Sequence, residues 1–364
     1  MSVGDRTLQI LHAIWTPLVL ITILTALVAF VAALGDVILA RTVTDALIKM
    51  VMVIGLYIFI GNSGVLAFGH IAFTMIGAYA TAWLTLPVLR KSFTLHLPPI
   101  LAEHQWPAIP AAIASAGLAA LVAFITGFPI MRLGGIAASI ATLAVLGMFY
   151  TFYSNWGAWT MGAATLPGIP TYVGVWAALA WVVVAIIVAF VYQQSRLGLA
   201  LRATREDEFA ARAVGVSIWA QRLIAFVLSA FFMGIGGVLQ AHFLGSIAVK
   251  NFWLGLTFIV LAMLIVGGQR SMTGAVTGAA VISTIVETLR QFEMGLDIGG
   301  VHVQLPLGSQ ELGIAFLMLM ILIFRPSGIT GGREIPWPFG TRPFRPDNAA
   351  IEIGVKQSTQ PLPD

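Results

Sequence analysis

The residues best suited to recognition or chemistry lie in a polar stretch between two apolar segments, residues 193–221. This stretch contains the sequence SRLGLALRATREDEFAARAVGVS. Thr204 is followed three residues later by Asp207, a spacing that has the form of a helix capping box. Glu206, Asp207 and Glu208 would place negative charge on the first turn of a helix, where the helix dipole favours it. The pattern predicts a capped helix of about ten residues.

The second half of the same stretch supports this prediction. Glu208 and Arg212 are four residues apart with the acid first, a spacing that stabilises a helix by pairing across one turn. Gly215 can adopt the left-handed conformation that commonly ends a helix. The segment suits either a solvated connector or a docking element for a cytoplasmic partner. The candidate docking residues are Thr204, Arg205, Glu206, Asp207, Glu208, Arg212 and Gly215.

A second polar interruption lies at GNSG, residues 61–64, and continues to Gly69 and His70. Non-helical backbone inside a membrane is tolerated only where protein or a water-filled cavity satisfies it, so a broken helix here would suit a solute path. An ordinary cytoplasmic turn explains the same residues equally well. His70 has no second histidine or acid at ligand spacing, which argues against a metal site. The candidates for lining a path are Asn62, Ser63, His70, Ser139, Thr142 and Gln240.

Several kinds of chemistry are excluded by what the sequence lacks. There is no cysteine, so disulfides, thiolate metal sites and cysteine nucleophiles are ruled out. No Gly-Lys dipeptide occurs, although the phosphate-binding loop of many ATP-hydrolysing proteins requires one. The HExxH zinc motif is also missing. We therefore expect no metal and no cofactor, and any work driven by ATP has to be powered by another chain.

The elements that must hold these residues are membrane-spanning helices. Of the 364 residues, 59% are hydrophobic and only 9% are charged, whereas a soluble domain carries roughly a quarter charged residues. Apolar runs long enough to cross a hydrocarbon core recur along the chain. The predicted fold class is all-α, a polytopic transmembrane helical bundle of about ten spans. The predicted spans are residues 16–34, 44–60, 66–86, 108–126, 135–153, 172–192, 222–242, 253–268, 274–290 and 311–324.

The distribution of basic residues predicts the orientation of this bundle. If both termini are cytoplasmic, most of the Arg and Lys residues fall on inner loops and tails, as the positive-inside rule requires. Residues 1–325 are expected to form the transmembrane domain, with the stretch 193–221 as its cytoplasmic segment. Residues 326–364 are rich in proline and polar residues, which predicts a disordered cytoplasmic tail. Glu287 and Arg290 lie near the end of a span, where an ion pair directed towards the surface is favoured over a buried site.

Five motifs occur in a fixed order in the sequence. They are GNSGVLAFGHIAFTMIGAYATAWL (61–84), RLGGI (132–136), SRLGLALRATREDEFAARAVGVS (195–217), AFVLSAFFMGIGGVLQAHF (225–243) and FRPSGI (324–329). The first is similar to a glycine-rich LSLGHAAFFGIGAY segment, and the third to a cytoplasmic R-A-x-R-E-D-E-x-A-A segment. Both segments are typical of the permeases of branched-chain amino acid ABC transporters. The chain resembles the LivM-like member of that permease pair.

The resemblance implies that the region from Glu206 to Gly215 is a coupling helix that docks in a cleft of an ATPase subunit. It also implies the partners: a second, LivH-like permease subunit, two ABC ATPase subunits, a periplasmic solute-binding protein and membrane lipid, with no nucleic acid. The expected location is the bacterial inner membrane, and the chain is not expected to be an enzyme. Branched-chain amino acids are the leading solute. Arg270 and Ala275 stand where the family tends to have Gly and Pro, so urea, short amides and other amino acids stay open.

Two other classes of protein are consistent with parts of the sequence. GNSG contains a GxSG, and Ser63 with His242 resembles the nucleophile and base of a rhomboid-like intramembrane serine protease. The predicted topology argues against this, because it puts Ser63 near the inner face and His242 near the outer face, roughly 30 Å apart. A secondary transporter that works without ATPase subunits is the other alternative, and gradient-driven uptake by this chain alone would support it.

Overall fold

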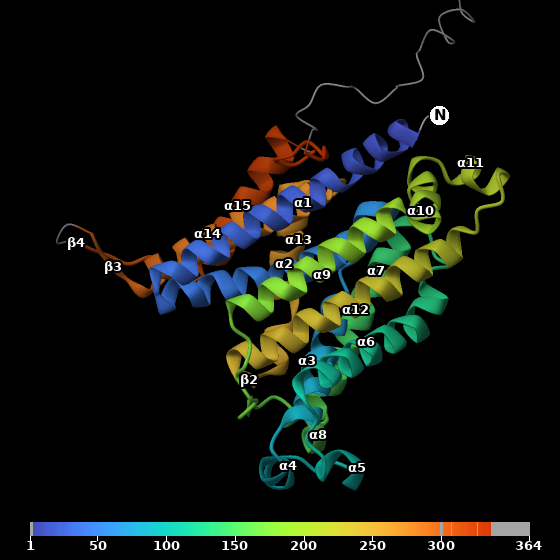
Figure 1. Ribbon diagram of the computed structural model, residues 1–364. Helices are drawn as coiled ribbons and strands as arrows, with labels where there is room; N and C mark the ends of the chain where they lie inside the picture. Colours follow the sequence, from blue (N-terminus) through green and yellow to red (C-terminus); the bar gives the residue numbers. More distant parts are fainter. Residues whose placement is uncertain (1–2, 299–300, 307, 326, 336–364) are drawn as a thin grey trace, which may run out of the picture.

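Long apolar helices make up most of the molecule (Figure 1). The computed structural model describes residues 3–298, 301–306, 308–325 and 327–335. The longer helices are α1 (Val3–Leu34), α2 (Val37–Ser63), α3 (Ile71–Thr85), α6 (Ala108–Ile130), α7 (Gly135–Asn155), α9 (Val175–Gln194), α12 (Ile218–Leu244), α13 (Leu254–Gly267), α14 (Met272–Met294) and α15 (Ser309–Phe324). The shorter helices are α4 (Val88–Thr94), α5 (Pro99–Ala102), α8 (Gly157–Thr160), α10 (Arg196–Glu206), α11 (Glu208–Ala213) and the 3₁₀ helix η1 (Val249–Phe252).

Four very short strands complete the described elements. They form two antiparallel pairs, β1 (Leu166–Pro167) with β2 (Ser246–Ile247) and β3 (Leu296–Ile298) with β4 (Val301–Val303). Each strand has only two or three residues. The strands tie loops together at the end of the bundle away from α10 and α11, and the fold is the predicted helical one (Figure 1).

The number of membrane spans is slightly smaller than the sequence predicts. Among the described residues, eight helices are long and apolar enough to cross a membrane, or nine if the bent pair α3–α4 counts as one span. All ten predicted segments coincide with helices. α13 has only 14 residues and counts as a span only together with the preceding η1, as Val249–Gly267. α3 has 15 residues and α15 has 16, so each is only about 22 to 24 Å long against a hydrocarbon core of roughly 30 Å. α3 continues into α4 only through a bend of 117°.

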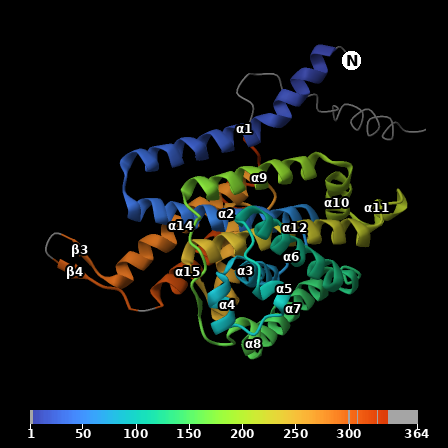
Figure 2. The same cartoon turned by 60° about the horizontal axis from the view of Figure 1, so that its bottom comes forward.

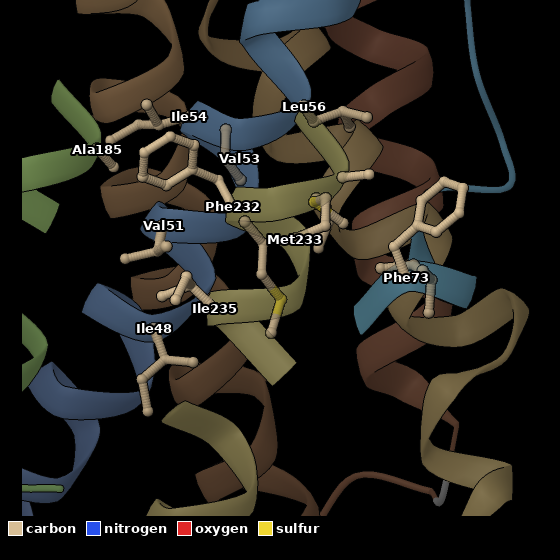
Figure 3. Close-up of a cluster of buried hydrophobic side chains, with 14 of the residues drawn as sticks. Ile48, Val51, Val53, Ile54, Leu56, Phe73, Ala185, Phe232, Met233 and Ile235 are labelled. Carbon is tan, nitrogen blue, oxygen red and sulfur yellow. The ribbon is translucent and has the colours of Figure 1, made fainter. Parts of the chain in front are cut away.

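α2 is the central helix of the bundle. Residues 50–63 are buried around its whole circumference, as expected of a helix that is apolar on every face. Side chains from α2, α3, α9 and α12 meet in one cluster (Figure 3). α12 runs antiparallel to α2, because a Cβ placed on Gly55 would lie 2.9 Å from the Cβ of Phe232, whereas one on Gly236 would lie 2.4 Å from the Cγ of Met52. The two 27-residue helices therefore pack closely against each other near their middles.

Glycine permits the closest approaches between helices. A Cβ on Gly77 in α3 would lie 2.3 Å from the carbonyl oxygen of Gly234 in α12. One on Gly278 in α14 would lie 1.9 Å from the carbonyl oxygen of Met263 in α13. Neither contact leaves room for a side chain, so small residues here let the backbones touch, as they commonly do in membrane bundles.

The connections at the two ends of α2 follow local sequence rules. Gly35 adopts the left-handed conformation (φ 68°) after α1, and the Asp36 carboxylate accepts hydrogen bonds from the N–H groups of Ile38 (2.8 Å) and Leu39 (3.2 Å). Asp36 is thus the N-cap of α2. At the other end Gly64 is left-handed (φ 71°) and stops the helix after Ser63.

The first residues of the predicted tail pack on the bundle. The N–H of Ile329 donates to the carbonyl oxygen of Val266 (2.8 Å), and the Glu334 carboxylate accepts from the N–H groups of Met272 (2.8 Å) and Thr273 (3.1 Å). Glu334 therefore satisfies the free amides at the start of α14. Residues 336–364, most of the tail predicted to be disordered, lie outside the described residues.

Candidate functional site

The polar stretch 193–221 forms two short helices, α10 and α11, where the sequence predicts one. Asp207 separates them, because its extended backbone (φ −153°, ψ 113°) cannot continue α10. Its carboxylate accepts hydrogen bonds from the N–H groups of Phe209 (2.8 Å) and Ala210 (3.0 Å). Asp207 is therefore the N-cap of α11.

Thr204 does not have the capping role predicted for it. It lies inside α10, its side chain is buried, and its hydroxyl donates to the carbonyl oxygen of Leu201 (2.7 Å). The predicted capping box is wrong because Asp207, the supposed back-bonding partner, itself reaches the free N–H groups of the next turn. The hydroxyl of Ser195 caps α10, accepting from the N–H of Gly198 (3.2 Å). Gly215 has the left-handed conformation that was predicted (φ 83°) and follows α11.

Glu208 connects α11 to the membrane bundle. The predicted pair with Arg212 is present, with a nitrogen–oxygen distance of 3.6 Å. Glu208 also forms a hydrogen-bonded ion pair with Arg222, in the first turns of α12. The Arg222 side chain is 7% exposed, whereas that of Arg212 is 65% exposed. The contact with Arg222 is therefore shielded from solvent and holds α11 more firmly than the pair within the helix.

Arg205 connects α10 to the end of α2. Its guanidinium donates to the carbonyl oxygen of Gly61 (2.6 Å) and to the carboxylate of Glu206 (2.8 and 3.1 Å). The same hydrogen bonds and positive charge hold the pKa of the exposed Glu206 carboxyl below its usual value. The stem of Arg205 lies over Gly64, where a Cβ would meet its Cγ at 2.7 Å. A movement of α10 would therefore act directly on the backbone of α2.

The interruption between α2 and α3 lies within the bundle. Residues 64–70 form no regular helix, and Val65, Ala67 and His70 are buried among them. The His70 ring packs against Phe59 and Phe226, with ring centroids 5.4 and 5.0 Å away. Phe59 precedes the end of α2 by one turn, so α3 begins about 6 Å inside that end. The segment runs back along α2, with Gly69 also buried, whereas Gly64 and Leu66 are exposed.

The predicted path residues on α7 close over this interruption. The Ser139 hydroxyl donates to the carbonyl oxygen of Leu66 (2.5 Å). A Cβ on Gly69 would lie 1.8 Å from the carbonyl oxygen of Thr142, so the two backbones are in contact there. The Thr142 hydroxyl donates to the carbonyl oxygen of Ser139 (2.8 Å). Ser139 and Thr142 therefore stabilise the interruption through backbone contacts.

Five of the six predicted path residues come together, and one does not. The Asn62 amide donates to the carbonyl oxygen of Ile58 (3.0 Å), and the Ser63 hydroxyl accepts from the N–H of Val65 (3.1 Å). Both lie at the interruption with the residues described above. Gln240 is on α12, 14 residues beyond Phe226, which places it about 21 Å away along the helix.

A cavity of about 480 Å³ joins the interruption to the polar segment. Ser63 and Gly64 line it from the α2 side, and Asp207, Glu208 and Arg222 from the side of α11 and α12. The candidate docking residues and the start of the interruption thus share one space at one end of the molecule. Figure 2 shows α10 and α11 extending from the bundle at this end.

The outer surface of α11 exposes apolar side chains. Phe209, in α11, is 83% exposed, and Val214, which directly follows the helix, is 79% exposed; Arg212, between them in the sequence, is exposed as well. An exposed aromatic and an aliphatic residue beside a charge form a small mixed surface of the kind that protein partners bind.

Comparison with known proteins identifies the family. Residues 38–324 match the family described as the branched-chain amino acid transport system permease component. That match covers most of the chain. The chain belongs to this permease family. It is therefore a subunit of a membrane transport system and not an enzyme.

Individual relatives agree with this membership. The chain is 28% identical to the high-affinity branched-chain amino acid transport system permease protein LivM of Salmonella typhimurium, covering 82% of this chain and 71% of the relative. It is 27% identical to the protein of the same description from Escherichia coli, covering 86% and 74%. A shorter match, 31% identical over 39% of the chain, is to a nucleoside ABC transporter permease protein of Lactococcus lactis. No solved structure matches the chain.

The alternative of an intramembrane protease is wrong for this family member. His242 is buried, and its ring nitrogens contact the hydroxyl of Thr81 (3.0 Å) and the carbonyl oxygen of Pro170 (2.8 Å). Ser63 is at the end of α2, while His242 is at the opposite end of the antiparallel α12. The supposed nucleophile and base therefore lie at opposite ends of the bundle.

Two residues of the site were not among the sequence candidates. Arg222 is the buried partner of Glu208. A basic residue at the edge of a predicted span was the available signal, because such residues need a partner. Gly61 supplies the carbonyl oxygen for Arg205, a contact between residues 144 positions apart that no local pattern predicts.

Proposed function

We propose that this chain is the transmembrane permease subunit of an ABC importer that moves branched-chain amino acids, or related small polar solutes, across a bacterial inner membrane. It pairs with a second, LivH-like permease subunit. The complex contains two ABC ATPase subunits, one of which binds the α10–α11 segment of this chain, and a periplasmic solute-binding protein delivers the solute. The face that carries α10 and α11 is cytoplasmic, and both chain termini lie on that side. Membership of the permease family supports each part of this proposal.

The observation that carries the proposal is the way α11 is attached. Its outer surface offers Phe209, Arg212 and Val214 to a partner, while its inner side is held by the ion pair of Glu208 with the buried Arg222. Exposed apolar side chains near an exposed charge suit the binding of a protein partner. Force from a bound ATPase would pass through Glu208 into α12.

A second connection extends from the same segment to the interruption. Arg205 links α10 to the carbonyl oxygen of Gly61, where α2 ends and the non-helical residues 64–70 begin. We propose that movement of α10 changes this interruption and opens or closes the solute path beside it. Asn62, Ser63 and His70 are the members of the predicted set that would move directly.

Purification with the neighbouring gene products tests this function. A tagged chain, expressed with the proteins encoded beside it, should retain two ATPase subunits and a second permease, and the complex should hydrolyse ATP. In proteoliposomes it should take up solute only when ATP and the binding protein are present. Recovery of an intact, stable chain without these partners, or uptake driven by a gradient alone, would overturn the proposal.

Two variants sharpen the test of the docking surface. Glu208→Ala combined with Arg212→Ala should release the ATPase subunits from the purified complex. Glu103→Ala combined with Lys250→Ala removes one acidic and one basic exposed residue away from α11 and serves as the matched control. Equal ATPase recovery with the two double variants would contradict the role of α11.

A further inference from the structure

A row of charged residues lies along α2 at the end of the bundle opposite α10 and α11. Arg41, Asp45 and Lys49 are four residues apart, so they share one face of the helix. Glu287 and Arg290 lie on α14, and all five line one cavity of about 490 Å³. That volume is within the range of about 300 to 1,000 Å³ usual for small-molecule sites. The sequence predicts the pair of Glu287 with Arg290, but no local pattern predicts that this pair meets the charges on α2.

The charges in this cavity are only partly neutralised. Lys49 pairs with Asp45 (2.5 Å), and Arg290 pairs with Glu287 (2.7 Å). The charge of Lys49 also acts on Glu287, and that of Asp45 acts on Arg290, which couples the two helices. Arg41 has no ion-pair partner among the described residues; its guanidinium lies 5.9 Å from the Phe243 ring centroid. The cavity therefore carries one uncompensated positive charge.

The burial of these groups argues against a chance arrangement. The side chains of Lys49 and Glu287 are 14% and 18% exposed. Ionisable residues within membrane-spanning helices are costly, and they commonly mark the path of a substrate or ion. A purely structural pair would neutralise itself and would not need an open cavity and a third cation beside it.

The rest of the cavity wall combines the polar residues Thr42, Ser283 and Gln310 with four apolar ones. Phe243 and Leu244 contribute from the end of α12, and Ile38 and Val286 from α2 and α14. One unpaired cation, two carboxylates that are each paired with another cation, and several aliphatic and aromatic side chains thus surround the same space. These three features complement the carboxylate, the ammonium group and the side chain of an aliphatic α-amino acid.

We propose that this cavity binds a zwitterionic aliphatic α-amino acid as it enters the permease. Arg41 binds the carboxylate by charge-assisted hydrogen bonds, and Asp45, the more exposed of the two acids, accepts from the ammonium group. Phe243 and Val286 contact the side chain. The inference rests on the proposed import function and narrows its solute, since urea and simple amides lack the carboxylate that Arg41 requires.

Ligand binding to the whole transporter tests the site. The permease pair with its ATPase subunits would be placed in nanodiscs without the solute-binding protein, and binding of radiolabelled L-leucine measured at equilibrium. L-leucinamide, which lacks the carboxylate, and 4-methylpentanoate, which lacks the amine, should compete poorly. Arg41→Gln should weaken L-leucine binding by about ten- to a hundredfold, as expected for loss of hydrogen bonds to a charged group. Arg41→Lys should restore part of it.

Lys250→Gln is the matched control, because it removes one exposed positive charge from η1, outside the cavity. It should leave L-leucine affinity unchanged. ATP hydrolysis by the same samples separates the two proposals. A complex that retains its ATPase subunits and hydrolyses ATP, but binds no L-leucine or binds it equally with Arg41→Gln, would overturn the site and leave the import function standing. Loss of co-purified anionic phospholipid on Arg41→Gln, with L-leucine affinity unchanged, would likewise overturn it in favour of a lipid headgroup.

Discussion

The two ends of α2 use polar and charged groups in opposite ways. At the end near α10, the carbonyl oxygen of Gly61 accepts from Arg205, and the Ser63 hydroxyl accepts from the backbone of Val65. The contacts there are made within the protein, to backbone atoms. At the other end, Arg41 and the ion pair of Asp45 with Lys49 line an open cavity.

This difference separates a mechanical role from a binding role. A charged side chain that donates to backbone carbonyl oxygens fixes the distance between two elements, as Arg205 does for α10 and α2. A charged side chain left without a partner beside a cavity remains available to a ligand, as Arg41 does. The buried middle of α2 connects the two, since residues 50–63 are surrounded by protein. One helix can thus link the docking end of the permease to its proposed solute site.

The largest effect is expected from disturbing the close packing of α3 against α12. Gly77→Val would place side-chain atoms on the carbonyl oxygen of Gly234, where even a Cβ would lie at 2.3 Å. Since the added Cβ is attached rigidly to one helix and the oxygen belongs to the backbone of another, neither atom can move aside, and we expect destabilisation by about 3 kcal/mol or more and little folded protein. Heating followed by size-exclusion chromatography in detergent measures this. Gly117→Val is the control, because no atom lies within 4 Å of a Cβ there; equal thermal stability of the two variants would contradict the packing.

The next largest effect should follow from removing Arg222. Arg222→Leu leaves Glu208 without its buried partner and should cost about 1 to 3 kcal/mol in the attachment of α11. Arg212→Leu removes the exposed partner of the same carboxylate and should cost less than about 1 kcal/mol. Hydrogen exchange of the backbone amides in residues 207–215 reports both. If Arg212→Leu accelerated exchange as much as Arg222→Leu, the anchoring of α11 through α12 would be wrong.

The sequence predicts the position of the docking segment better than its internal structure. Charge, capping residues and Gly215 place a short helix in the right region, and the pair of Glu208 with Arg212 is present. The division into α10 and α11 escaped prediction because Asp207 suits two roles, a residue inside the first turn and an N-cap. Only the folded backbone decides between them. Arg222 escaped because its partner lies 14 residues away across a turn.

The charged cavity shows where a span-by-span prediction fails. Residues 44–60 were predicted as the second span, whereas α2 begins at Val37. The predicted span therefore leaves Arg41 outside the helix and places Lys49 near its end. With the longer helix, Arg41, Asp45 and Lys49 form one face. Their meeting with Glu287 depends on the packing of α2 against α14, which local patterns do not contain.

A smaller effect is expected from cutting the link between α10 and α2. Arg205→Ala removes a charge-assisted hydrogen bond to the carbonyl oxygen of Gly61, worth about 1.5 kcal/mol. ATPase binding should persist, while the amount of solute imported per ATP hydrolysed should fall roughly tenfold. Uptake and phosphate release measured in the same proteoliposomes give this ratio. Arg270→Ala, a substitution of an exposed arginine with no hydrogen bond to α2 among the described residues, is the control. An unchanged ratio in Arg205→Ala would show that coupling takes another route.

The smallest effect is expected from removing the aspartate N-caps of α11 and α2, which lie at opposite ends of the molecule. Asp207→Ala removes the cap of α11 and Asp36→Ala that of α2, each by deleting two hydrogen bonds to backbone N–H groups. Each loss costs about 1 kcal/mol locally. α11 has six residues and α2 has 27, so the same local cost should accelerate amide exchange about fivefold throughout α11 but only in the first turn of α2. Asp207→Asn retains an acceptor oxygen and should exchange nearly as slowly as the original protein. If Asp36→Ala accelerated amide exchange throughout α2, as Asp207→Ala is expected to do throughout α11, the buried middle of α2 would not hold that helix. The contrast between the two ends of α2 would then fail.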